Sequence, residues 1–206
     1  MIVLATHNPH KITELQYGLA RAGIVSTEQR IYFSDSVEED GLSFVENALK
    51  KARFASKKTG LPALADDSGL EVNSLGGAPG IFSARYSSCS NDNAEEGEQD
   101  NCNITKLLAA LSDRPKVVQR MARYSCAMVY VQHEKDPMPL IGIGHWYGDI
   151  LRQRRTRQGI GYDDVMWIPA LVKTVSELSL EQKMRYGHRA QALRAIIHQL
   201  TQCGDG

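Results

Sequence analysis

Residues 63–87 read ALADDSGLEVNSLGGAPGIFSARYS. The apolar residues 63–65 predict a short buried strand that delivers Asp66 and Asp67. Two adjacent carboxylates at a strand end repel each other, and a hard divalent cation such as Mg²⁺ relieves that repulsion. Crowding also raises one carboxyl pKa, which suits a general base. A tight turn in which one aspartate caps a backbone N–H accounts for the same residues, so both interpretations stay open at this point.

Strands and helices alternate along the rest of the chain. Further strands are expected over residues 2–6, 70–72, 124–132 and 140–146. Helices are expected where Ile12, Leu15, Leu19 and Ala22 recur, after the caps Ser43 and Ser179, over residues 104–111 and from about Arg189. Glycines in residues 76–80 predict a sharp turn, and residues 87–101 read as an exposed, mobile loop. This mixture predicts an α/β or α+β sheet protein with no clear linker.

Bulk composition excludes several classes of protein. The 206 residues include 24 Lys plus Arg and 24 Asp plus Glu, a balance that argues against a nucleic-acid polyanion as the main partner. Apolar runs are too short to span a membrane, and the N-terminus does not resemble a signal peptide. The cysteines lack metal-type spacing and read as free thiols of a reducing cytoplasm: Cys89, Cys102, Cys126 and Cys203.

A polar turn precedes the first expected helix, and it reads Thr6-His7-Asn8-Pro9-His10-Lys11. Backbone N–H groups at a helix N-terminus attract phosphate. Thr6 and Asn8 add side-chain donors and Lys11 adds a positive charge, so the segment is a candidate phosphate site. It lacks the P-loop pattern, and taken alone the segment is more often an ordinary capped turn with a solvated lysine.

Two further groups of residues are candidates. The acidic run Glu38-Glu39 precedes a helix, where it is usually a solvated N-terminus, and it gains a function only if it faces Asp67 to complete a metal site. A second group lies near the C-terminal end of the sequence. It has glycines that permit close approach to a ligand, an aromatic ring that can stack, and cations that can bind phosphate or a carbonyl. Its members are Gly159, Ile160, Gly161, Tyr162, Asp163, Lys183, His188 and Arg189.

In order and content, these segments resemble the inosine/xanthosine triphosphate pyrophosphatases, a family acting on non-canonical purine nucleotides. The resemblance rests on Thr6, Asn8 and Lys11, on FVENALKKA from Phe44, and on the whole of residues 63–87. GIGYD from Gly159, Lys183, and GHRAQAL from Gly187 complete it. The matching segments span nearly the whole chain, and residues 65–87 are the most specific of them.

The resemblance implies a single ITPase-like (Maf-like) α/β domain over residues 1–206: an elongated mixed β-sheet flanked by helices, two lobes with a central cleft, usually as a homodimer. It implies Mg²⁺-dependent hydrolysis of dITP, ITP, XTP or dXTP to the monophosphate and pyrophosphate. Residues 6–11 would hold the triphosphate, with Ser68 and Lys183 assisting. Glu39 and Asp67 would hold Mg²⁺ with Asp66 close by, and Asp67 would accept the proton of the attacking water. Residues 160–163, His188 and Arg189 would surround the base.

The chain departs from the family pattern in the base loop. Ile160 stands where an aromatic residue is expected, which puts base affinity or selectivity in question. Asp164 replaces a proline, a change expected to loosen the loop. Two alternatives follow: a pyrophosphatase for another modified nucleotide, or a non-catalytic nucleotide-binding or sensing protein on the same scaffold.

Overall fold

The computed structural model describes residues 1–88 and 97–202. Its α-helices are α1 (Pro9–Arg21), α2 (Phe44–Thr59), α3 (Glu98–Ala110), α4 (Leu180–Tyr186) and α5 (His188–Gln202). Its strands are β1 (Ile2–Leu4), β2 (Ser26–Glu28), β3 (Ala63–Val72), β4 (Met121–Val131), β5 (Leu140–Ile150), β6 (Met166–Ile168) and β7 (Lys173–Thr174). They form one seven-stranded sheet in the order β2-β1-β3-β4-β5-β6-β7. The predicted mixed sheet with helices is confirmed.

The chain divides into two compact units. Unit 1 comprises Met1–Ser68, Cys126–His145 and Met184–Gly206, and unit 2 comprises Gly69–Ser125 and Trp146–Lys183. Because β3, β4 and β5 each contribute residues to both units, the boundary falls within strands and not in a linker. The single domain over residues 1–206 stays a prediction.

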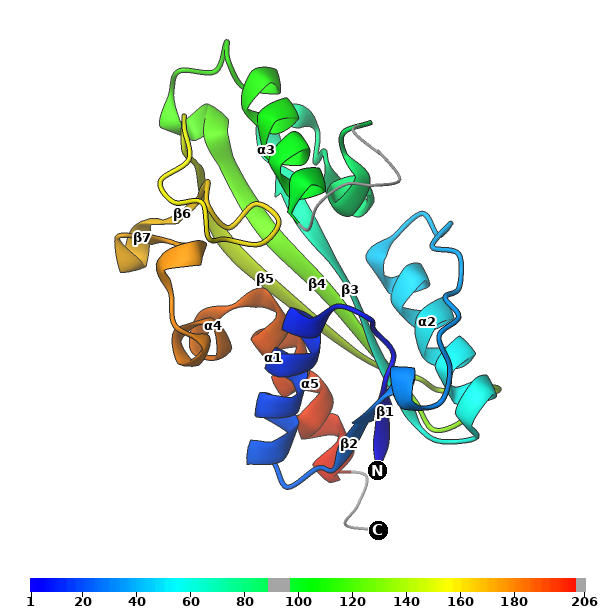
Figure 1. Cartoon of the computed structure of the whole chain (residues 1–206). Coiled ribbons are helices and arrows are strands. Elements are labelled where there is room, and N and C mark those ends of the chain that lie inside the picture. The colour runs from blue at the N-terminus through cyan, green and yellow to red at the C-terminus, as the bar shows by residue number, and fades with distance from the viewer. Residues whose placement is uncertain (89–96, 203–206) are drawn as a thin grey trace. The chain divides into compact units, whose positions relative to one another are not determined.

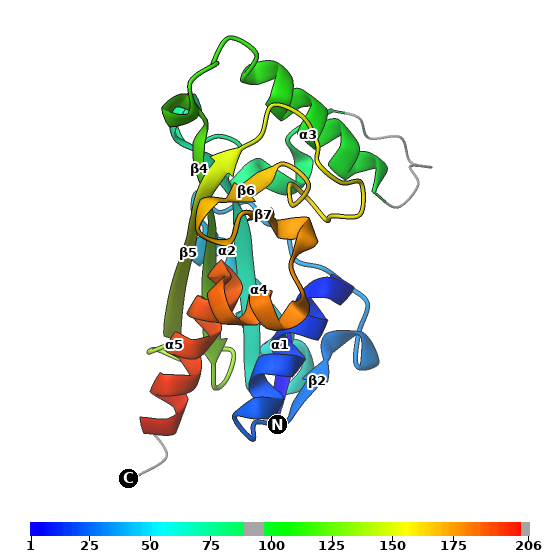
Figure 2. The same cartoon turned by 90° about the vertical axis from the view of Figure 1, so that its left-hand side faces the viewer.

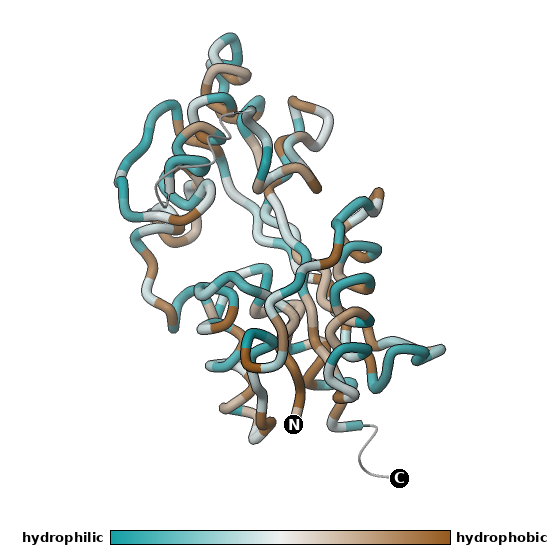
Figure 3. Tube along the Cα trace, turned by 45° about the vertical axis from the view of Figure 1, so that its right-hand side comes forward, coloured by the Kyte–Doolittle hydropathy of each residue, from teal (hydrophilic) through white to brown (hydrophobic). Residues whose placement is uncertain are grey.

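Unit 1 has helices on both faces of its strands (Figure 1). On one face α1 and α5 lie side by side, and their apolar residues form a cluster with Leu4, Leu64 and Met128. On the other face the alanines of α2 pack against Val3 and Val129. Neighbouring residues of β1 thus enter different clusters, as strand alternation requires. Figure 3 shows β1 near the N-terminus as a strongly hydrophobic segment.

The largest difference from the expected elements is at β3. One ten-residue strand replaces the two expected short strands, and it runs without a break through the segment Asp66-Asp67-Ser68-Gly69. Parallel pairing with β1 holds its start, with Val3 opposite Ala63 and Leu4 opposite Leu64. The tight-turn interpretation of the two aspartates is therefore wrong.

Helix ends follow the sequence signals closely. Ser43 accepts the N–H of Glu46 at the start of α2, and Gly60 ends that helix in a left-handed conformation. Ser179 and Gln182 cap α4 reciprocally. Ala22 was expected on the buried face of the first helix, but α1 ends at Arg21 and Ala22 is its exposed C-cap.

Unit 2 is built around its own core. Leu70, Tyr124 and Trp146 from the long strands pack with apolar residues of α3 and β6. α3 also packs against the 3₁₀ segment Gly80–Arg85 (Figure 2). α3 begins at Glu98, so residues 98–101 are helical and not part of a loop, while residues 89–96 of the expected loop lie outside the described residues.

Two expectations from composition concern thiols and membranes. Cys126 is a free thiol, as expected, and Cys89 and Cys203 lie outside the described residues. Within residues 1–88 and 97–202, no helix has the length and apolar character that a membrane crossing requires.

Gly144 on β5 lets the start of α5 approach the sheet. A Cβ at this position would lie 2.0 Å from the carbonyl oxygen of His188 and 2.9 Å from the backbone nitrogen of Ala192. We expect Gly144→Ala to lower the free energy of unfolding by about 1–3 kcal/mol, because α5 must shift outward. Urea denaturation measures this. Ile143→Val on the exposed face of β5 is the control, and an equal effect from both variants would contradict the explanation.

Candidate active site

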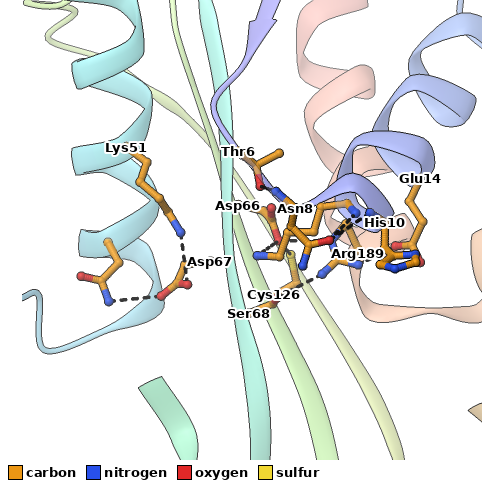
Figure 4. A network of polar contacts seen from close by, with 12 residues as sticks. Thr6, Asn8, His10, Glu14, Lys51, Asp66, Asp67, Ser68, Cys126 and Arg189 are labelled. Carbon is orange, nitrogen blue, oxygen red and sulfur yellow. Dashed lines mark hydrogen bonds and ion pairs between the residues drawn. The ribbon is translucent and has the colours of Figure 1, made fainter. Parts of the chain in front are cut away.

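Strand β3 sends Asp66 and Asp67 to opposite faces of the sheet (Figure 4). Adjacent strand residues point in opposite directions, so the two side chains do not share one space. Asp66 faces the layer of α1 and α5, where it meets Lys11 and Arg189. Asp67 faces α2, where it meets Asn47 and Lys51. The expectation of two crowded, mutually repelling carboxylates is therefore wrong, and each aspartate has its own surroundings.

Asp66 is a fully buried anion with two cationic partners. Its Oδ2 lies 3.0 Å from Lys11 Nζ and 3.1 Å from Arg189 Nε. Among the described residues, its Oδ1 has no hydrogen-bond partner. Burial alone would raise the pKa of Asp66, but Lys11, Arg189 and Lys51 outweigh it and hold the pKa well below the usual range. Asp66 is therefore ionised under all ordinary conditions.

Arg189, at the start of α5, connects three side chains. Besides Asp66, its guanidinium donates to Ser68 Oγ at 3.1 Å and pairs with Glu14 on α1. The Arg189 side chain is only 12% exposed. Burial lowers the pKa of Arg189, but the charges of Asp66 and Glu14 raise it by more, so the net shift of the pKa is upward. In this structure the guanidinium is committed to fixing Asp66 and Ser68, which differs from the base-contacting role implied for it.

Asp67 is held from α2. Its Oδ2 accepts Asn47 Nδ2 at 3.1 Å, and its Oδ1 lies 3.3 Å from Lys51 Nζ. Lys51 Nζ also contacts Glu39 Oε2 at 3.1 Å, so one ammonium group joins two carboxylates. Asn47 in turn accepts the N–H of Gly41 at 2.8 Å, which fixes its amide. Because Asn47 and Lys51 are four residues apart, they lie on one face of α2.

The charges around Asp67 leave it a better proton acceptor than an ordinary aspartate. Burial raises its pKa, and although Lys51 and Lys11 lower it, the net pKa stays above the usual value. For Lys51, burial lowers the pKa, but Asp67, Asp66 and Glu39 reverse this and the net shift is upward. Lys51 is therefore a firm cation beside a carboxylate with enhanced basicity.

Glu39 and Asp67 fit a divalent cation in chemical type. They are hard oxygen donors, and the Lys51 ammonium between them shows that their shared space favours positive charge. Within residues 1–88 and 97–202, no group of three or more metal-binding side chains gathers. A pair suffices for Mg²⁺, which commonly takes one or two protein carboxylates and completes its shell with water and substrate phosphate. Glu38 is exposed and Glu39 half-buried, which favours Glu39 as the ligand.

The polar turn before α1 is capped from within. Asn8 Oδ1 accepts the backbone N–H groups of His10 at 2.9 Å and Lys11 at 3.2 Å, and Thr6 Oγ1 accepts the N–H of Asn8. The expected phosphate cradle of backbone N–H groups is thus partly occupied by Asn8 itself. The positive end of the α1 dipole remains next to the turn. Pro9 opens the helix, and His7 contacts a carbonyl oxygen of Asp35.

In unit 2 the candidate residues 160–163 form a compact turn, and Lys183 of α4 contacts it. The Asp163 carboxylate accepts Tyr124 Oη at 2.9 Å and Lys183 Nζ at 2.7 Å. Ile160 is partly exposed, at 36%. Tyr162 is only 3% exposed and its hydroxyl donates to the carbonyl of Ser83, so its ring is not available to stack on a base as expected. Its role is to anchor the turn in the core.

Sequence reasoning missed three side chains of the network: Asn47, Lys51 and Glu14. Asn47 and Lys51 lie in the segment FVENALKKA, which was quoted only as a family signature and as a capped helix. Their four-residue spacing was the available signal, because it places an amide and an ammonium on the face that also carries Ala48 and Ala52. No local signal pointed to Glu14, since its partner Arg189 is 175 residues away.

Comparison with known proteins places the chain in a family. A family model described as the Ham1 family matches residues 2–199. A dITP/XTP pyrophosphatase of Yersinia pseudotuberculosis is 47% identical over 199 residues, covering 97% of each chain, and one of Escherichia coli O157:H7 is equally similar. The structure of a HAM1 protein from Coxiella burnetii superposes with a TM-score of 0.84 at 41% identity over 98% of each chain. The chain belongs to the Ham1 family.

The Asp66 ion pairs predict a specific dependence of stability on pH. The pKa of Asp66 is lower in the folded chain than in the unfolded one, so the unfolded chain binds the proton first on acidification. Stabilisation by Asp66 is then complete above pH of about 4 and falls by about 1.4 kcal/mol per pH unit below it. The difference in unfolding free energy between wild type and Asp66→Asn, measured in urea with EDTA, should shrink accordingly.

At pH 7 Asp66→Asn should cost about 3 kcal/mol, because Lys11 and Arg189 lose their counter-charge. The exposed Asp113→Asn is the control, and it should change neither the stability nor its slope with pH. A pH-independent difference between wild type and Asp66→Asn would contradict the ion-pair explanation.

Proposed function

We propose that this chain hydrolyses non-canonical purine nucleoside triphosphates, dITP, ITP, XTP and dXTP, to the monophosphate and pyrophosphate. The observation that carries the proposal is the arrangement of Glu39, Lys51 and Asp67, in which two carboxylates share one cation and burial raises the pKa of Asp67. The similarity to dITP/XTP pyrophosphatases over 97% of the chain supports the choice of reaction.

Asp67 acts as the general base. It takes a proton from water, whose oxygen bonds to the α-phosphorus while the bond to the bridging oxygen breaks and pyrophosphate leaves. A base works best when its pKa approaches the working pH, and the burial of Asp67 acts in that direction. Asn47 keeps the carboxylate oriented by donating to Oδ2, and Asp66 stays ionised and takes no proton.

Glu39 and Asp67 are the residues proposed to hold Mg²⁺, and Asp66 supports the local negative charge from the other face. Bound there, Mg²⁺ would neutralise charge on the triphosphate oxygens. Lys51 contacts both carboxylates in this structure. Once Mg²⁺ took its place between them, the Lys51 ammonium would be free to pair with a phosphate oxygen. Lys11, Ser68 and the dipole of α1 add to the electrostatic attraction for the triphosphate.

Residues 160–163 are proposed to contact the base, and His188 stays a predicted base contact. Lys183 is proposed to assist in holding the triphosphate, and Arg189 fixes Asp66 and Ser68. Donors aimed at a 6-keto oxygen would select hypoxanthine and xanthine over adenine, whose amino group leaves those donors unpaired at roughly 1–3 kcal/mol each. Guanine shares the 6-keto oxygen, so its rejection must depend on the 2-position. Thr6, His7, Asn8, Pro9, His10 and Lys11 are proposed substrate contacts at the phosphate end.

A homodimer in the cytoplasm completes the proposal. The dimer is supported by the family resemblance, and the compartment by the free thiol of Cys126. Light scattering of the purified protein checks the dimer, for which the expected mass is twice 22.8 kDa.

A substrate panel tests the reaction. With Mg²⁺, pyrophosphate release from dITP or XTP should far exceed that from ATP or GTP, and Asp67→Asn should lower kcat by at least roughly 100-fold. Asp40→Asn, an exposed aspartate next to Glu39, is the control and should behave as wild type. Tight ITP binding without turnover by wild type would instead favour the sensing protein, and turnover of another modified nucleotide would change the substrate class.

The acidic pair Glu38-Glu39 allows a matched test of the metal site. Glu39→Gln should raise the Mg²⁺ concentration needed for half-maximal rate by at least about tenfold, because one of two charged ligands is lost. Glu38→Gln removes the same charge one residue away from an exposed position and should leave the Mg²⁺ titration unchanged. Equal shifts in both variants would mean that only long-range charge matters at this site.

A further inference from the structure

Asp164 directly follows the turn formed by residues 160–163, and its exposed fraction is only 2%. Its Oδ1 accepts the backbone N–H of Gly159 at 2.9 Å and the hydroxyl of Thr156. Its own carbonyl oxygen accepts the N–H of Arg155 at 3.1 Å. A buried carboxylate is tolerated only with such partners. The expectation that an aspartate in place of proline loosens this loop is therefore wrong, because the Asp164 side chain fastens the loop through two hydrogen bonds that a proline could not accept.

The same hydrogen bonds continue into the 3₁₀ segment Val175–Glu177. Thr156 Oγ1 lies 2.6 Å from Ser176 Oγ, and the Ser176 N–H donates to the carbonyl of Asp163 at 3.2 Å. Gly159 has no room for a side chain, since a Cβ would lie 2.7 Å from Asp164 Oδ1 and 2.9 Å from Ser176 Cβ. Thr156 and Gly159 are thus held against the turn, while Arg155, Arg157 and Gln158 are exposed.

The turn itself is held at each end. Inside it, the N–H of Asp163 donates to the carbonyl of Ile160 at 3.1 Å, and Gly161 adopts a positive φ of 58°. The N–H of Gly161 donates to Asp100 on α3 at 2.6 Å. Tyr124 and Lys183 fix the Asp163 carboxylate, while Asp164 fixes the chain that enters the turn. Two adjacent aspartates therefore orient one turn from opposite sides.

We propose that Asp164 is a positioning residue for base selection in this enzyme. Its carboxylate fixes residues 155–159 and so determines where Ile160 and Asp163 are presented to the purine, an inference that rests on the proposed function. Ile160 lacks the π-face of an aromatic residue, so selection depends on how accurately the turn places its polar groups. The Asp164 side chain acts through the turn and not on the reacting atoms.

Trypsin measures the loop directly, without any need for turnover. Arg154, Arg155 and Arg157 are cleavage sites within the segment that Asp164 fastens. Asp164→Ala and Thr156→Val remove the hydrogen bonds, and both should be cut at Arg157 at least about fivefold faster than wild type. Asp164→Asn and Thr156→Ser keep an acceptor or a hydroxyl in place and should be cut at close to the wild-type rate.

Kinetics then connect the loop to base selection. Asp164→Ala should raise KM for dITP at least about fivefold and lower the preference for dITP over dGTP, while kcat stays within about twofold, since the general base is elsewhere. Asp164→Asn and Thr156→Ser should retain wild-type KM and selectivity. If Asp164→Ala does not fold, Thr156→Val carries the same test, with Thr156→Ser as its control.

The outcomes are distinguishable. An active wild type whose Asp164→Ala variant keeps its trypsin rate, KM and selectivity would overturn this inference and leave the proposed function intact. A fall in kcat with unchanged KM would also overturn it. A folded wild type that neither binds nor hydrolyses any purine triphosphate would overturn the proposed function and this inference with it.

Discussion

Strand alternation in β3 separates Asp66 from Asp67, and the rest of the candidate site depends on that separation. Had the two carboxylates shared one face, each would repel the other, and one cation would serve both. Instead, the layer of α1 and α5 supplies Lys11 and Arg189 to Asp66, and α2 supplies Asn47 and Lys51 to Asp67. One strand thus sets two electrostatic environments within two consecutive residues.

The two environments give the aspartates different chemistry. Asp66 has two cations at about 3 Å, so its pKa is far below the working range and it serves as a fixed negative charge. Asp67 is buried with one ammonium, which it shares with Glu39, so its pKa is raised and it accepts protons more readily. Pairs of acids whose surroundings move their pKa values apart are a common basis for assigning catalytic roles.

Local signals predicted the elements well, and long-range contacts account for what was missed. The caps at Ser43 and Gly60 act within a few residues, so sequence sufficed to place α2. The strand through Asp66 and Asp67 was expected as two short strands, with a tight turn between them left open, because its polar residues interrupt the apolar pattern. Asp164 was expected to loosen the loop because it replaces a proline. Its hydrogen-bond partners are a backbone N–H and a hydroxyl, which comparison with the family's sequence pattern does not reveal. The short strands β2, β6 and β7 carry too few residues for a periodic pattern.

The assignment of separate roles to Asp66 and Asp67 is tested most directly by a crystal structure with Mn²⁺ in place of Mg²⁺ and a non-hydrolysable dITP analogue. The anomalous signal locates the ion without ambiguity. Our account predicts Mn²⁺ coordinated by Glu39 and Asp67 on the α2 side, with Asp66 still paired with Lys11 and Arg189. Mn²⁺ coordinated by Asp66, with Asp67 still bound to Lys51, would contradict it.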